Sequence, residues 1–96
     1  MKKVKTASYE AHLHKDLQDP KFAAAYLSEC FNDDKKVFLL ALHDVAKAYG
    51  ISDVAKKSGL NRESLYKMFK GNPKLDTLDL FLKTIGLTMS FQAIEE

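Results

Sequence analysis

The spacing of apolar residues divides this 96-residue chain into two parts. Between residues 20 and 85, apolar side chains recur every three or four positions, which is typical of helices with one buried face. Beyond Gly86 the period falls to two, with Leu87, Met89, Phe91 and Ala93 alternating with Thr88, Ser90 and Gln92. The pattern predicts an all-α bundle of about five helices, followed by a short half-buried β-strand over residues 87–94.

Two long helices are expected in the first half of the chain. Residues 9–17 fit either a short helix or an extended strap, and residues 18–20 break it. Asp19 suits a helix cap and Pro20 a first turn, so a helix over residues 20–31 follows, and then a second over residues 35–49 that stops at Gly50. The side chains expected to face the core are Phe22, Ala23, Tyr26, Leu27, Cys30 and Phe31, then Phe38, Leu39, Leu42, Val45, Ala46 and Tyr49.

Residues 51–71 predict two short helices joined by a sharp turn. Gly59 suits the turn because it adopts a left-handed conformation without the penalty of a Cβ. Asn61 is a good N-cap for the second helix, and Gly71 ends it. A further helix is expected to start at Asp76 or Thr77 and to run to Gly86.

In the second short helix, Leu65, Met68 and Phe69 recur at helical spacing and are expected to face inward. The spacing of Val54, Ala55, Gly59, Leu60, Leu65 and Met68 matches a helix-turn-helix. The segment resembles the helix-turn-helix of phage-repressor-type (XRE family) proteins, although Ser58 replaces a more usual apolar residue. The resemblance implies a lambda-repressor-like fold. The alternative is an ordinary helical hairpin with solvated outward charges.

Charge is concentrated in the same stretch. The whole chain has a formal charge of only +2, but residues 49–74 hold six basic residues against two acidic ones. Such a local excess favours contact with phosphate. The residues expected to contact DNA are Ser52, Lys56, Lys57, Asn61, Arg62, Glu63, Ser64, Tyr66, Lys67, Lys70 and Lys74.

These candidates differ in their expected roles. Arg62 is expected to read guanine, and Glu63 either accepts from cytosine or only serves its own helix, through the dipole or a pair with Lys67. Ser64, Tyr66 and Lys67 are candidates for bases, thymine methyl groups or phosphates. Ser52 at a helix N-terminus and the remaining lysines are candidates for phosphate. One such module reads a short half-site, so we expect a homodimer on double-stranded operator DNA.

Other function classes find little support in the composition. One cysteine and three scattered histidines do not form a zinc site, and no phosphate loop or activated nucleophile is evident. We therefore expect no catalytic residue, metal or cofactor. Without a signal peptide or long apolar segment, the chain is expected to be cytoplasmic, with no membrane role. Residues 1–96 are expected to form one domain with a flexible start over residues 1–8, whose basic residues 1–5 could serve as a DNA-contacting arm.

A wider resemblance covers roughly residues 9–87. The fragments DP-x-F-A-x-x-YL, GL-x-RESLYK and GNP-x-L-x-T are similar to HigA-like antitoxins, the antidote proteins encoded beside toxins of the RelE type. The resemblance implies a DNA-binding antitoxin that represses its own promoter and neutralises a RelE/HigB-like, mRNA-cleaving toxin. The alternative is a stand-alone phage-repressor-like regulator without a toxin. The C-terminal strand is expected to pair with the N-terminal segment, with its counterpart in a second subunit or with a partner protein.

Overall fold

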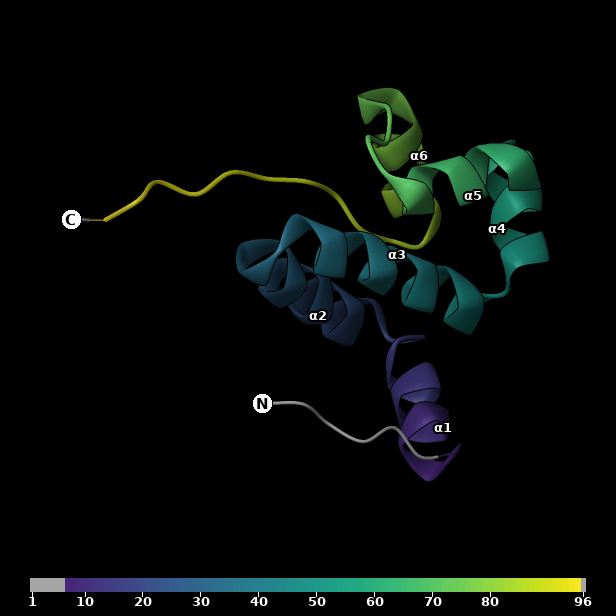
Figure 1. Cartoon of the computed structure of the whole chain (residues 1–96), viewed down its shortest axis with the longest axis horizontal. Helices are drawn as coiled ribbons and strands as arrows, with labels where there is room; N and C mark the ends of the chain where they lie inside the picture. Colours follow the sequence, from purple (N-terminus) through teal and green to yellow (C-terminus); the bar gives the residue numbers. More distant parts are fainter. Residues whose placement is uncertain (1–6, 96) are drawn as a thin grey trace.

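The computed structural model describes residues 7–95, in which six helices follow one another. They are α1 (Ala7–Asp16), α2 (Pro20–Asp33), α3 (Lys35–Tyr49), α4 (Ile51–Ser58), α5 (Arg62–Lys70) and α6 (Leu75–Thr84). Figure 1 shows α2 and α3 packed side by side, with α4 following the end of α3. In this view α4, α5 and α6 all lie above α3. The all-α prediction is confirmed, and residues 9–17 belong largely to a helix and not to an extended strap.

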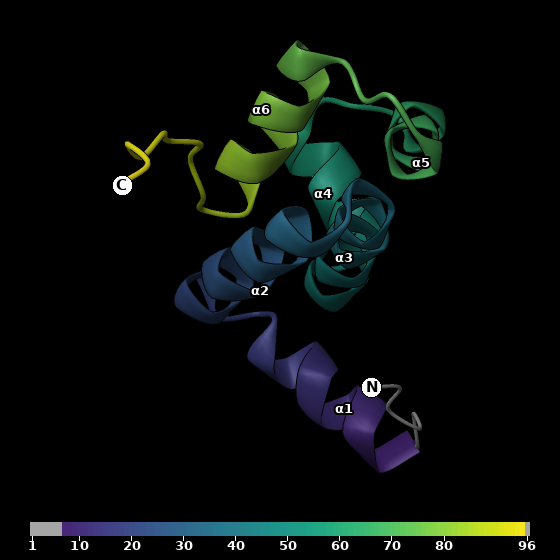
Figure 2. The ribbon, with the colours of Figure 1, turned by 60° about the vertical axis from the view of Figure 1, so that its left-hand side comes forward.

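The predicted strand over residues 87–94 is not formed. Residues 87–95 run as irregular chain that leaves the helices after α6, as both overall views show (Figure 1, Figure 2). The prediction of a strand was wrong because alternation alone does not form one, since a strand needs a neighbour to pair with its backbone. Residues 7–95 contain no other strand that provides one. Residues 1–6, which include the proposed basic arm, lie outside the described residues.

Polar side chains fix where the helices begin. Asp19 accepts a hydrogen bond from the backbone N–H of Lys21 at 3.0 Å, and Asp34 accepts one from Lys36 at 2.9 Å. Both contacts satisfy N–H groups that the first helical turn leaves without a partner. The predicted cap at Asp19 and the bounds of α3 are confirmed. α2 runs two residues further than expected, because Asp34 alone serves as the connection.

The core forms where α3 meets the other helices. Its largest fully buried side chains are Phe81, Leu17, Leu42, Leu65, Met68, Ile85, Val45 and Val54. Each comes from an apolar stripe at helical spacing, so every helix from α3 to α6 contributes one face. None of the helices in residues 7–95 reaches the length and apolar character needed to cross a membrane.

Two predicted core residues of α2 are exposed. Phe22 is 40% exposed and stacks on Tyr26, while Phe31 is 45% exposed and meets Phe38 edge-on with ring centroids 5.0 Å apart. Both rings lie at the edges of the apolar stripe, which is wider than the surface that α3 covers. Only Ala23 and Leu27 of α2 are fully buried.

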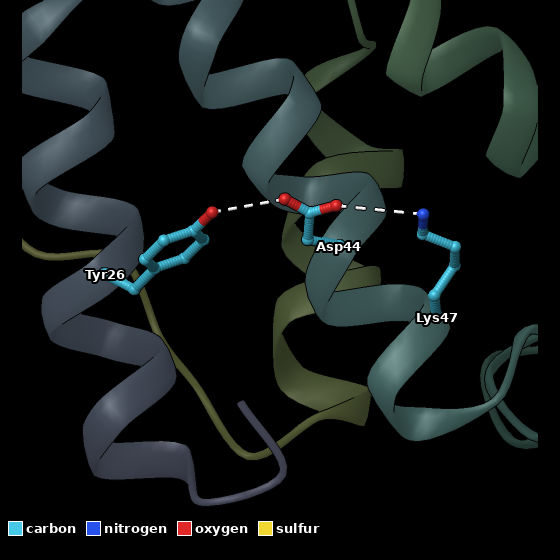
Figure 3. A network of polar contacts seen from close by, with 3 residues as sticks. All are labelled: Tyr26, Asp44 and Lys47. Carbon is cyan, nitrogen blue, oxygen red and sulfur yellow. Dashed lines mark hydrogen bonds and ion pairs between the residues drawn. The ribbon is translucent and has the colours of Figure 1, made fainter. Parts of the chain in front are cut away.

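A polar contact also joins α2 to α3. The Tyr26 hydroxyl donates to the Asp44 carboxylate at 3.1 Å, and the other carboxylate oxygen lies 3.8 Å from the Lys47 ammonium (Figure 3). Burial and the neighbouring Asp44 raise the pKa of Tyr26. The hydroxyl therefore stays protonated and keeps donating.

Candidate nucleic-acid interface

α4 and α5 are joined by a turn of three residues whose geometry is set locally. Gly59 adopts a left-handed conformation with φ 81°, and its N–H donates to the carbonyl of Ala55 at 3.0 Å. Ser58, which departs from the usual apolar residue, accepts a hydrogen bond from the N–H of Leu60 at 3.1 Å. Asn61 caps α5 by accepting from the N–H of Ser64 at 2.7 Å. The polar Ser58 thus stabilises the turn.

The two faces of α5 are divided as the spacing predicted. Leu65, Met68 and Phe69 are buried, which confirms the inward assignment. Leu60 is half-buried against the same core and lies in the turn. The outward face carries Arg62, Glu63, Tyr66, Lys67 and Lys70 exposed, with Ser64 half-buried. A short helix therefore presents one continuous polar face.

Arg62 is tied to the start of α4. Its guanidinium donates a hydrogen bond to the hydroxyl of Ser52, although the two residues are ten positions apart. The contact joins the first residue of α5 to the second residue of α4, so both helix N-termini lie close together. The corner combines a guanidinium and N-terminal amides, which attract anions, with the first-turn carboxylates of Asp53 and Glu63, so the two predicted site residues form one polar corner of mixed charge.

A groove of about 380 Å³ opens between the end of α5 and the start of α6. Its lining includes Lys67, Lys70 and Lys74 together with Ser64 and Thr77. No acidic residue lines the groove within residues 7–95. Four of the predicted site residues, Ser64, Lys67, Lys70 and Lys74, are thereby brought together in a basic, hydrogen-bonding groove.

An aromatic cluster packs α5 against α3. His43 of α3 stacks on Phe69 with ring centroids 4.7 Å apart and meets Tyr66 edge-on at 5.8 Å. Burial and, to a lesser degree, Lys47 lower the pKa of His43, while Asp44 opposes them. His43 and Asp44 are both half-buried and make specific contacts, so neither is a merely solvated surface residue. Tyr66 is therefore held in place by a neighbour from another helix.

The remaining predicted residues lie around this surface. Ser52, Lys56 and Lys57 are exposed on α4, and Asn61 is exposed in the turn. No ion pair joins Glu63 to Lys67 anywhere in the described part of the chain, which leaves the dipole or a base as the roles for Glu63. Outside residues 49–74 the chain holds nine basic and eleven acidic residues, so the positive charge belongs to this surface.

Sequence reasoning missed two features of the site. The hydrogen bond between Ser52 and Arg62 depends on the angle between two helices, and Thr77 reaches the groove only because α6 folds back beside α5. Neither residue type nor spacing carries that information. Cys30, expected to face the core, is half-buried, and burial raises the pKa of its thiol, which does not favour a reactive cysteine.

Comparisons with known proteins place the chain in a family. Residues 6–93 match the model of a family described as "Probable addiction module antidote protein". An uncharacterised protein of Haemophilus influenzae is 36% identical over 70 residues, which cover 70% of this chain and 72% of that relative. No solved structure matches the chain significantly. Since the family model spans nearly the whole chain, the protein belongs to the family of probable addiction module antidote proteins.

Proposed function

We infer that this protein is a DNA-binding antitoxin of a type II toxin-antitoxin module. In this proposal a dimer binds its own operator in the cytoplasm and represses transcription, and the protein also neutralises a RelE/HigB-like, mRNA-cleaving toxin. Family membership supports the antidote role in general. The observation that carries the DNA-binding role is the α4–α5 pair, with its polar outward face beside a groove lined by three lysines.

The geometry suits a helix-turn-helix docked in a major groove. The second helix of such a motif enters the groove, its N-terminal residues contact base edges, and the first helix crosses the backbone. Here Arg62, Glu63 and Tyr66 lie on the exposed face of α5, and Ser52 begins α4. The hydrogen bond to Ser52 orders the Arg62 guanidinium, and Arg62 is the first residue of α5, the end at which a helix of this motif contacts bases.

Binding to the chain's own upstream DNA tests the proposal. We expect fluorescence anisotropy to show specific binding, and Arg62→Ala to weaken discrimination at one base position in each half-site by a factor of about 5 to 150, the value of one bidentate pair. Ser52→Ala is the informative companion, because it removes the tether but leaves the guanidinium. Uniform weakening of all single-base operator variants by Arg62→Ala would assign this residue to phosphate contact.

The lysines are tested through salt dependence. Lys56, Lys57, Lys70 and Lys74 are proposed to contact phosphate, and each alanine substitution should lower the slope of log K against log salt by about 0.9. Lys36→Ala is the matched control, since this exposed lysine begins α3, away from the α4–α5 pair. An unchanged slope in the α4–α5 variants would contradict the proposed phosphate contacts.

The toxin role needs a separate measurement. Co-expression of the chain with the product of the neighbouring reading frame should relieve the toxin's effect on growth. Capture of the tagged chain from the same cells should recover the toxin. DNA binding without any captured toxin would favour the stand-alone regulator. Toxin capture without DNA binding would retain the antidote role and remove the repressor role.

A further inference from the structure

The C-terminal segment, residues 87–95, exposes large apolar side chains that the rest of the described chain leaves uncovered. Phe91 is 98% exposed, Ile94 92% and Met89 38%. Leu87 is half-buried against the core, and its N–H donates to the carbonyl of Leu82 at 2.8 Å. Beyond this anchor, residues 88–95 make no backbone hydrogen bond with any other described residue. A row of backbone donors and acceptors beside exposed apolar groups is a template for strand pairing.

The order of residues in this segment limits what can pair with it. Leu87, Met89, Phe91 and Ala93 occupy one face of an extended chain, and Thr88, Ser90 and Gln92 occupy the other. No charged residue occurs from residue 84 to residue 94. In an antiparallel pair about a two-fold axis, the residue on the axis opposes its own copy, so a charged residue there would face a charge of the same sign. A neutral, alternating segment suits its own copy, whereas it offers no charge to steer a charged partner protein.

We propose that residues 87–93 pair antiparallel with the same segment of a second copy of this chain, so that the C-terminal segment is the dimerisation surface. A register centred on Ser90 places Met89 opposite Phe91 and Leu87 opposite Ala93. The polar face then matches as well, with Thr88 opposite Gln92. In this register every apolar residue of the strand faces an apolar residue. A register centred between Ser90 and Phe91 would instead place Met89 opposite Gln92 and Phe91 opposite Ser90.

A two-stranded ribbon is only marginally stable in water, so its apolar face must be covered. The anchor at Leu87 keeps the start of the segment against the helices. In the proposed dimer, the apolar face of the ribbon packs against the helices of the two subunits. This inference deepens the proposed function, because it names the surface that makes the dimer. The dimer itself does not depend on DNA binding.

The oligomeric state of the full-length protein tests the proposal. Analytical ultracentrifugation at about 50 μM should give a dimer for the unmodified chain, a monomer for Phe91→Asp and a dimer for the matched control Gln92→Asp, which adds the same charge on the opposite face. Circular dichroism and the unfolding midpoint check that each variant keeps its helices. A monomeric unmodified chain, or a dimer unaffected by Phe91→Asp, overturns the proposal.

The register is tested by cross-linking in a Cys30→Ser background. Residues opposite each other in an antiparallel pair have Cα atoms about 4.5 to 5.5 Å apart, within reach of a disulfide. Ser90→Cys should therefore form a covalent dimer under mild oxidation. Gln92→Cys is the control, because its copies lie four residues apart along the ribbon, or about 14 Å at a rise of about 3.4 Å per residue. Preferential cross-linking at position 92 overturns the register.

Two further results separate this inference from the proposed function. Phe91→Asp should bind a single half-site like the unmodified chain but lose at least tenfold in affinity for the two-half-site operator. A dimer that binds no DNA would defeat the proposed repressor role and leave the pairing intact. Capture of a co-expressed toxin that is abolished by Phe91→Asp, together with a monomeric free chain, would assign the segment to the toxin and overturn the pairing.

Discussion

Two pairs of consecutive helices in this protein differ in the length of their helices and in how those helices are connected. α2 and α3 have 14 and 15 residues and are joined through Asp34 alone, which ends one helix and caps the next. α4 and α5 have 8 and 9 residues and are joined by a turn of three. Helices as short as α4 and α5 are unstable alone in water, so their stability comes from caps and from tertiary packing.

The two pairs differ in how much of their surface they bury. α3 buries Ala41, Leu42, Val45, Ala46 and Ala48, whereas α5 buries three side chains and exposes a polar face. The position of α5 therefore depends on its packing against the other helices, while its outward side chains contribute little to the stability of the fold. Changes in the two pairs should separate stability from binding, and the largest effects should come from the shared core.

Leu42 and Leu65 provide a direct comparison of the cores of the two pairs. Both side chains are 0% exposed, so alanine at either position should reduce the free energy of unfolding by about 2 to 5 kcal/mol. Urea denaturation measures the loss. A cost below about 1 kcal/mol for Leu65→Ala would mean that α5 is not part of the cooperative unit.

The turn between α4 and α5 is sensitive at Gly59. A Cβ there meets no atom within 4 Å, so the cost of Gly59→Ala is the left-handed backbone alone, about 1 to 2 kcal/mol. Gly59→Asn is the matched variant, because asparagine tolerates this conformation better. Equal losses for alanine and asparagine in thermal unfolding would contradict a left-handed requirement.

Loss of a helix cap should destabilise the two pairs equally but should affect DNA binding in only one of them. Asn61→Ala and Asp34→Ala each remove one side-chain acceptor at a helix start, at a cost of about 1 kcal/mol. Only Asn61→Ala should also weaken DNA binding, because it loosens the N-terminal turn of α5. Unfolding and anisotropy measured on the same samples decide this. A comparable loss of DNA binding in Asp34→Ala would show that the two pairs are not independent.

The contact between Tyr26 and Asp44 is expected to have a smaller effect. Tyr26→Phe removes one hydrogen bond to a half-buried carboxylate that keeps Lys47 nearby, at a cost of about 0.5 to 1.5 kcal/mol. Because folding raises the pKa of Tyr26, its contribution is complete below about pH 10 and is lost as pH rises above that value. The unfolding curves of the unmodified protein and of Tyr26→Phe should therefore differ at pH 8 and converge as pH rises above about 10. A constant difference would contradict the contact.

The smallest expected effect is the pH dependence from His43. Folding lowers its pKa, so the unfolded chain binds the proton more readily, and stability should fall as pH drops below about 6.5. His43→Phe keeps a ring against Phe69 and should remove this part of the decline. Unfolding midpoints at pH 7.5 and 5.5 measure it. The same decline in both proteins would assign it to other groups.

Much of the fold was predictable because its causes are local. Asp19, Asp34 and Asn61 each cap a helix within their own few residues, and Gly59 needs only its own backbone freedom. The inward face of α5 followed from the spacing of Leu65, Met68 and Phe69. The outward residues of the site followed as the complement of that face.

Tertiary structure alone decided what depends on the angle and distance between helices. It left Phe22 and Phe31 half-covered, brought Arg62 onto Ser52, and placed Thr77 beside the lysines of α5. It also left residues 87–95 without a strand partner, although their alternation is plain in the sequence. A periodic pattern determines which face of an element is apolar, but only packing between elements determines how much of that face is covered.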